Sequence, residues 1–401
     1  MGPPAGSNKR QKKQGTMDSL LGLPTLPSYF VLRPAPDGGL VAEWLAALPS
    51  GEPQGEAEWR AEARFGTRHA TLVSLATAGA DGENDAQGHR SGAREGAALS
   101  EPPAVADVPM LKSLLQKAVR RRHKRAAVWA AAALLELSAD DLLRRLPIVA
   151  LEDVGLCGGL LPALVWMMAA HTKGWAPGPC HMHWLLNAVA SLCEVAEREV
   201  PGAAEQLLVS DRQLLARCGG GGAPPAGTLS LMLSLNARLE YGGMASDMHM
   251  IKWYMNTWHS RLQEPQRSAV PVATSGPPLS TFVSALPVAP LPLSGWLLPA
   301  IDFHCSDVVP RVLAAAPHLR LSMRLSPDEL ASLMWDFSSS VNSRALLPGS
   351  APAPCPRGSR PRWDAVRQAV MKAAHAILQE KVAEAAAKRR AAEHPVKPRA
   401  Q

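Results

Sequence analysis

The sequence predicts an all-α protein, with a multi-helix globular domain, a disordered N-terminal region and a Pro-rich linker. Two observations support this fold class. Apolar residues recur at the three- and four-residue spacing of buried helical faces in several segments after residue 105. The 36 Pro and 31 Gly gather in the first hundred residues and near 265–300 and 348–361. An ordered middle is therefore flanked and interrupted by segments with little regular structure.

The composition divides the chain into segments with different expected order. These are a mostly disordered low-complexity region (1–104), a helical core domain (105–263), a Pro-rich linker or surface loop (264–300), a helical extension of the core (301–345), a second linker (346–362), a C-terminal helix (363–391) and a basic tail (392–401). Within the first region, LVAEWLAAL at 40–48 predicts a short helix that ends before Pro49, and 70–75 predicts a strand or a helix.

The centre of the chain predicts consecutive helices. The first buried stripe consists of Leu111, Leu114, Leu115, Ala118 and Val119. A second apolar segment spans 126–137. Ser138 with Asp141 three residues later is typical of a helix N-cap, and Pro147 suits the first position of a further helix.

Later segments repeat the helical pattern. Helices are predicted at 160–172, 182–196, 203–217, 228–239 and 243–262. Ser326, Pro327 and Glu329 together indicate another helix start, with Ser as the cap and Glu reaching back to its backbone.

Composition and motifs exclude several classes of protein. No apolar run approaches the roughly 18 residues that span a bilayer, so we expect no membrane contact. The six cysteines have no CxxC spacing, which favours reduced thiols inside a cell. The P-loop pattern GxxxxGK[ST] does not occur. We expect no cofactor and no metal, and we lean towards a protein that is not an enzyme.

Two clusters of cations stand out against a formal net charge of +7. Near the N-terminus, Lys9, Arg10, Lys12 and Lys13 form either a nuclear import signal or a solvated tail, so the expected compartment is the nucleus or otherwise the cytoplasm. The second cluster, the basic run, consists of Arg120, Arg121, Arg122, Lys124 and Arg125. Five cations within two helical turns can neutralise several phosphates, which predicts nucleic-acid binding, and the alternative is a solvated helix end.

Two other groups of polar residues suggest different roles. Asp302, His304 and Cys305 bring a carboxylate, an imidazole and a thiol within four residues, which is an alternative site for an enzyme of unknown reaction. Opposite charges at the ends of neighbouring predicted helices favour a structural ion-pair corner over acid–base chemistry. The residues of this corner are Arg144, Arg145, Glu152 and Asp153.

Three segments in the centre of the chain carry a resemblance to a known family. They are LQKAVR (115–120), AVWAAAALL (127–135) and LLRRLPIVALEDVGL (142–156). Over about fifty residues this pattern resembles the helical C-terminal region of clamp-loader-like ATPases of the replication-associated recombination family, without the ATPase core. The resemblance implies a region that supports oligomer assembly near DNA.

A second resemblance covers more of the chain. With YGGMASDMHMI, IDFHCSD and WDFSSSVNSR added, the span 105–345 looks similar to uncharacterised proteins of algae and large DNA viruses. This likeness implies no activity.

The sequence therefore predicts a non-enzymatic helical assembly or adaptor module associated with nucleic acid, in DNA replication or repair. A protein partner or a second copy of the chain is also expected. The alternatives are the enzyme centred on Asp302, His304 and Cys305, and a purely structural protein-binding module. The last alternative is favoured if the basic run faces another helix.

Overall fold

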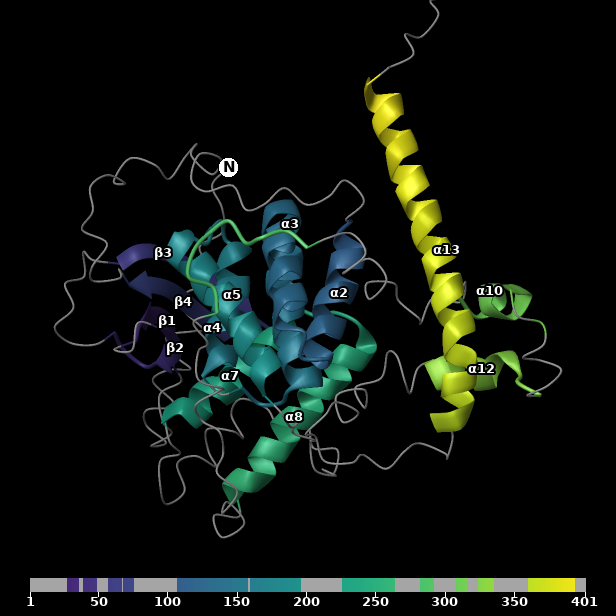
Figure 1. The fold of residues 1–401 in the computed structure, drawn as a ribbon. Coiled ribbons are helices and arrows are strands. Elements are labelled where there is room, and N and C mark those ends of the chain that lie inside the picture. Colours follow the sequence, from purple (N-terminus) through teal and green to yellow (C-terminus); the bar gives the residue numbers. More distant parts are fainter. Residues whose placement is uncertain are drawn as a thin grey trace, which may run out of the picture. The chain divides into compact units, whose positions relative to one another are not determined.

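The structure is a computed structural model in which an N-terminal sheet precedes a series of helices (Figure 1). It describes residues 27–35, 39–48, 57–66, 68–75, 107–157, 159–195, 226–263, 282–291, 308–315, 317, 324–334 and 360–393. The strands are β1 (Tyr29–Pro34), β2 (Leu40–Leu45), β3 (Ala57–Phe65) and β4 (Arg68–Leu75). The helices are α2 (Val108–Arg120), α3 (Lys124–Asp153), α4 (Leu160–His171), α5 (Pro179–Glu194), α7 (Ala226–Glu240), α8 (Ala245–Gln263), α10 (Val308–Ala315), α12 (Pro327–Met334) and α13 (Arg360–Glu393).

The all-α prediction is wrong, because the four strands form a mixed sheet in the order β2-β1-β4-β3. β1 pairs antiparallel with β2 and parallel with β4, and β3 pairs antiparallel with β4. The segment 40–45, predicted to begin a short helix, is a strand. Its residues alternate between the two faces of the sheet, and Ala42 and Trp44 are buried on the same face. The segment also contains Ala and Glu, and because both residues are common in helices, the sequence favoured a helix over a strand.

Several predicted helices are confirmed. Ser138 departs from helical geometry inside α3, and its hydroxyl accepts a hydrogen bond from the Asp141 amide. Ser326 and Glu329 exchange the two hydrogen bonds of a capping box at the start of α12. Helix α3, however, continues through Pro147 instead of starting again there. The helix predicted at 203–217 lies outside the described residues.

The chain divides into two compact units, which we describe separately. The first unit comprises 1–89, 146–184 and 199–279, and the second comprises 90–145, 185–198 and 280–401.

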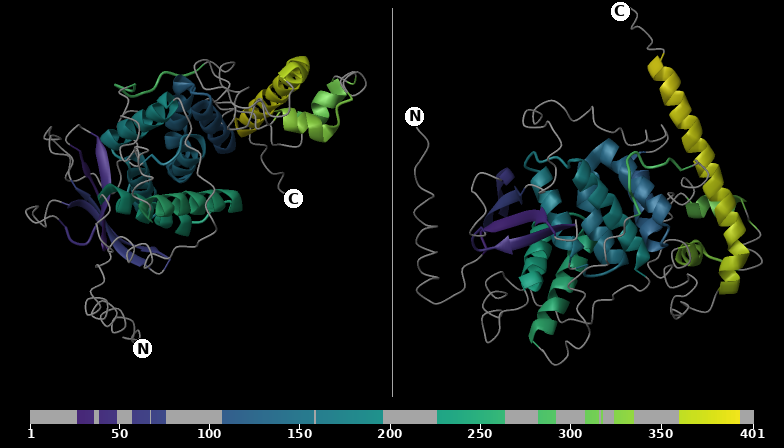
Figure 2. Two further views of the ribbon diagram at one scale, coloured as in Figure 1. Left: turned by 90° about the horizontal axis from the view of Figure 1, so that it is seen from below. Right: turned by 60° about the vertical axis from the view of Figure 1, so that its left-hand side comes forward.

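In the first unit, α4 and α7 cover one face of the sheet (Figure 2). Indole N–H groups of Trp side chains connect the sheet to the helices that cover it. The Trp166 Nε1 donates to the Phe30 carbonyl at 2.8 Å, and the Trp44 Nε1 donates to the Ser234 hydroxyl at 3.2 Å. Phe30 and Trp44 stack with ring centroids 4.4 Å apart, and both are buried. A Trp ring therefore supplies apolar area and also a hydrogen bond that fixes a helix on the sheet.

In the second unit, hydrogen bonds join α2 to the first part of α3, and the long helix α13 packs against α10 and α12. The buried stripe of α13 consists of Trp363, Val366, Val370 and Ala373. These positions lie three and four residues apart, which is the spacing of one buried face of a helix. An ion pair between Arg311 and Glu380, at 2.6 Å, also joins α10 to α13.

Candidate functional site

The basic run begins at the C-terminus of α2. This helix starts at Asp107, whose carboxylate accepts a hydrogen bond from the Met110 amide at 2.8 Å. It ends in a Schellman turn, in which the amide of Arg122 donates to the Val119 carbonyl and the amide of His123 donates to the Ala118 carbonyl. Such a turn requires one residue in the left-handed region.

That residue is Arg122, with a φ of 61°. The position usually belongs to Gly, because a Cβ atom there crowds the backbone. The strained turn directs the chain into α3, with only three residues between the two helices. It thereby places the side chains of the basic run on two helix ends and on the turn between them.

The five cations of the basic run differ in their environments. Arg120 is 3% exposed, whereas Arg125 is exposed on the first turn of α3. Arg121, Arg122 and Lys124 are partly buried. The run is therefore not a uniformly solvated helix end.

Two members of the run contact the end of α5, in the same unit. The Arg122 guanidinium donates to the carbonyl oxygens of Cys193, at 3.2 Å, and Glu194, at 3.3 Å. The Lys124 ammonium pairs with the Glu194 carboxylate at 2.6 Å. The two carbonyl oxygens belong to the last turn of α5, where helical carbonyls carry partial negative charge. Arg122 and Lys124 therefore act as a cationic cap on another helix.

Lys124 also has an aromatic neighbour. Its ammonium lies 5.2 Å from the centroid of the Phe282 ring, in a cation–π geometry. Hydrogen bonds hold the residue after Phe282. Asn187 in α5 accepts from the Val283 amide at 2.7 Å and donates to the Val283 carbonyl at 3.1 Å. The segment after residue 282 is thus held against α5 and the basic run together.

Burial and neighbouring like charges lower the pKa values of Arg121 and of His123, which lies within the same turn. Burial, followed by the neighbouring Arg120 charge, lowers the pKa of Arg121 to about 10. Arg121 still carries its charge at neutral pH. Burial, followed by the Arg121 charge, also lowers the pKa of His123, which favours the neutral imidazole. An anion close to these guanidinium groups would offset their mutual repulsion.

The residues of the predicted ion-pair corner lie along α3. Arg144 pairs with Asp140, one helical turn earlier, at 2.8 Å. Arg145 donates to the side-chain oxygen of Gln116 in α2. Glu152 and Asp153 form the C-terminal end of α3, and Asp153 is 1% exposed. In the structure, the first two residues of this group therefore stabilise α3 and its packing on α2.

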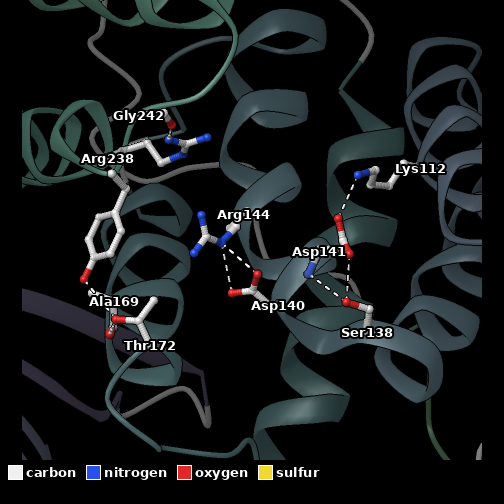
Figure 3. Close-up of polar contacts among 10 residues, drawn as sticks. Lys112, Ser138, Asp140, Asp141, Arg144, Ala169, Thr172, Arg238 and Gly242 are labelled. Carbon is white, nitrogen blue, oxygen red and sulfur yellow. Dashed lines mark hydrogen bonds and ion pairs between the residues drawn. The ribbon is translucent and has the colours of Figure 1, made fainter.

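A neighbouring ion pair joins α2 to α3, and the sequence did not predict it. Lys112 in α2 pairs with Asp141 in α3 at 2.7 Å, and Ser138 donates a hydrogen bond to the same carboxylate (Figure 3). The hydrogen bond from Lys112 is the largest cause that lowers the pKa of Asp141. Lys112 and Asp141 are 29 residues apart, so local spacing gave no signal for this contact.

The alternative site, Asp302, His304 and Cys305, lies outside the described residues, as does the N-terminal basic cluster. Within the described residues, no group of three or more His, Cys, Asp or Glu side chains is arranged to hold a metal ion. The same part of the chain contains no helix with the length and apolar character needed to cross a membrane.

Comparison with known proteins adds no relative. No protein-family model, curated protein or solved structure matches the chain.

Proposed function

We propose that the chain is a non-enzymatic assembly or adaptor module that acts by binding protein. The observation that carries this proposal is the contact of the basic run with α5, through Arg122 and Lys124. Cations that cap a helix are engaged within the fold and are less free to follow a phosphate backbone. The resemblance of residues 115–156 to an assembly region of recombination ATPases supports the same class of function.

The test separates a protein partner from nucleic acid. The full-length chain, with an affinity tag, is used to capture proteins from native extract with and without nuclease treatment, and quantitative mass spectrometry compares the two samples. The proposal expects a specific partner that survives the nuclease and is captured equally by the Arg125→Gln variant. A partner lost with either change would refute binding through protein contacts alone.

Nucleic-acid contact is a second candidate function, and the environment of Arg121 favours it. Arg121 lies beside the like charge of Arg120, and the exposed Arg125 follows four residues later. A phosphate bound by Arg121 would offset its repulsion with Arg120. We propose Arg121 and Arg125 as the nucleic-acid contacts of the run.

A gel-shift titration at several salt concentrations tests this second candidate. Replacing Arg121 and Arg125 by Gln should lower the affinity for duplex DNA and reduce the slope of log affinity against log salt by about two. The matched control replaces Lys173 and Lys252, two exposed lysines, by Gln. Equal affinities for wild type and the Arg121/Arg125 variant would eliminate the candidate.

A further inference from the structure

The two edges of the sheet in the first unit are unlike each other. At the β2 edge, the Trp44 amide donates to the hydroxyl of Ser230 in α7 at 3.0 Å. A backbone group that would otherwise attract another strand is thus already bonded, and α4 and α7 both contact this strand. Among the described residues, no strand pairs with the outer side of β3 at the opposite edge.

β3 is a long edge strand with a distinct charge pattern. It has nine residues, and its register with β4 is regular from Trp59 to Phe65. The exposed residues alternate in sign along the strand, and they are Glu58, Arg60, Glu62 and Arg64. The register with β4 shifts between Ala57 and Trp59, so Arg60, Glu62 and Arg64 lie in the regular part of the strand. The other face of the strand carries Trp59 and Phe65, which contact the rings of Trp166 and Tyr241.

The charge pattern is complementary to itself when a second strand runs antiparallel. If Ala61 lies opposite Ala61 of the second copy, Arg60 faces Glu62, and the two-fold axis repeats this pair. Glu58, at the register shift, lies near the end of the second strand that carries Arg64. A shift of the second strand by two residues in either direction instead places Arg60 opposite Arg60 or Glu62 opposite Glu62. A parallel strand in register also brings like charges together. Among these arrangements, only the antiparallel register centred on Ala61 pairs opposite charges.

The backbone is compatible with this register. In an antiparallel pair, every second residue directs its N–H and C=O away from the strand already paired. The register centred on Ala61 pairs even-numbered residues with even-numbered residues, so outward-facing groups meet outward-facing groups. We propose that β3 pairs with β3 of a second copy of this chain, which joins two four-stranded sheets into one across a two-fold axis.

Charged edge strands more often protect a sheet from association. Protection works best with charges of one sign, usually lysines, because a second copy is then repelled in every register. Along β3 the signs alternate, and the same charges that discourage shifted registers favour one of them. The pattern therefore selects a specific dimer. This inference does not depend on the proposed binding of other proteins, because it concerns a second copy alone.

The experiment measures the mass of the full-length chain by sedimentation velocity over a range of concentrations. Two variants make the strand charges uniform. The acidic variant is Arg60→Glu with Arg64→Glu, and the basic variant is Glu58→Arg with Glu62→Arg. We expect a wild-type dimer, a dissociation constant raised at least about tenfold in each variant alone, and restored association when the two variants are mixed.

Controls separate the strand contact from changes in folding or net charge. Replacing Lys173 and Lys252 by Glu changes the net charge as much as the acidic variant does, on exposed helical and turn positions, and should leave the wild-type dimer intact. Circular dichroism spectra confirm that each variant is folded. A wild-type chain that stays monomeric at all concentrations would overturn the proposal, and so would a dimer that both charge variants retain.

Discussion

The cap that Arg122 places on α5 allows a prediction in which two effects of one residue are separated. Replacing Arg122 by Ala removes the hydrogen bonds to the Cys193 and Glu194 carbonyls, but keeps a Cβ atom at a φ of 61°. Hydrogen bonds to a charged group each stabilise a protein by up to about 1.5–3 kcal/mol. Because both bonds here are long and Arg122 is partly exposed, we expect a loss of about 2 kcal/mol in total.

The Arg122→Gly variant removes the same hydrogen bonds and also the backbone strain. A residue with a Cβ atom in the left-handed region costs roughly 1–2 kcal/mol relative to Gly. The greater freedom of Gly in the unfolded chain offsets part of this gain. The Gly variant should therefore be about 1 kcal/mol more stable than the Ala variant.

Urea unfolding of the full-length chain, followed by circular dichroism, measures both differences. The matched control is Arg125→Ala, an exposed cation of the same run, which should change the free energy of unfolding by less than about 0.5 kcal/mol. If Arg122→Ala is as stable as wild type, the contacts with α5 do not stabilise the fold. If the Gly variant is no more stable than the Ala variant, the argument from backbone strain is refuted.

Three further predictions concern the first unit. Ser230→Ala leaves the Trp44 amide without its hydroxyl acceptor and should lower the free energy of unfolding by about 1–3 kcal/mol, whereas Ser246→Ala at an exposed position of α8 should not change the urea midpoint. Burial lowers the pKa of His181 to about 4, below its usual 6.5, so the unfolded chain binds the proton more tightly and stability falls as the pH drops below 6.5. Between pH 7 and pH 5 the free energy of unfolding should fall by about 2 kcal/mol in the wild type but not in His181→Gln, as measured by urea titration. An equal pH dependence in the two proteins would contradict a buried neutral imidazole. Burial, followed by the Glu58 charge, raises the pKa of the Cys180 thiol, so iodoacetamide should label Cys180 slowly at pH 7 and faster in Glu58→Gln, and an unchanged rate would show that Glu58 has no effect.

Local sequence signals predicted helix ends well because they act within one turn. Ser138 with Asp141, and Ser326 with Glu329, lie three residues apart, and the hydrogen bonds of a cap form over that distance. The buried stripe of α13 was also visible, because its spacing repeats over several turns. For the segment 70–75, which lies in β4, the sequence left a strand and a helix as alternatives, whereas it did not predict the other three strands. Leu40–Leu45 becomes a strand through pairing with β1, and a sequence pattern does not show which segment will supply that partner.

The sequence by itself determined that five cations lie close together where two predicted helices meet, and that helices predominate in the centre of the chain. Only the tertiary structure decided how those cations are used. Arg122 reaches carbonyl oxygens of α5 that follow it by 71 and 72 residues, whereas Arg125 remains exposed. The physical reason is that charge and helical periodicity are local properties. Burial and the choice of partner depend on which distant segments the fold brings beside each side chain.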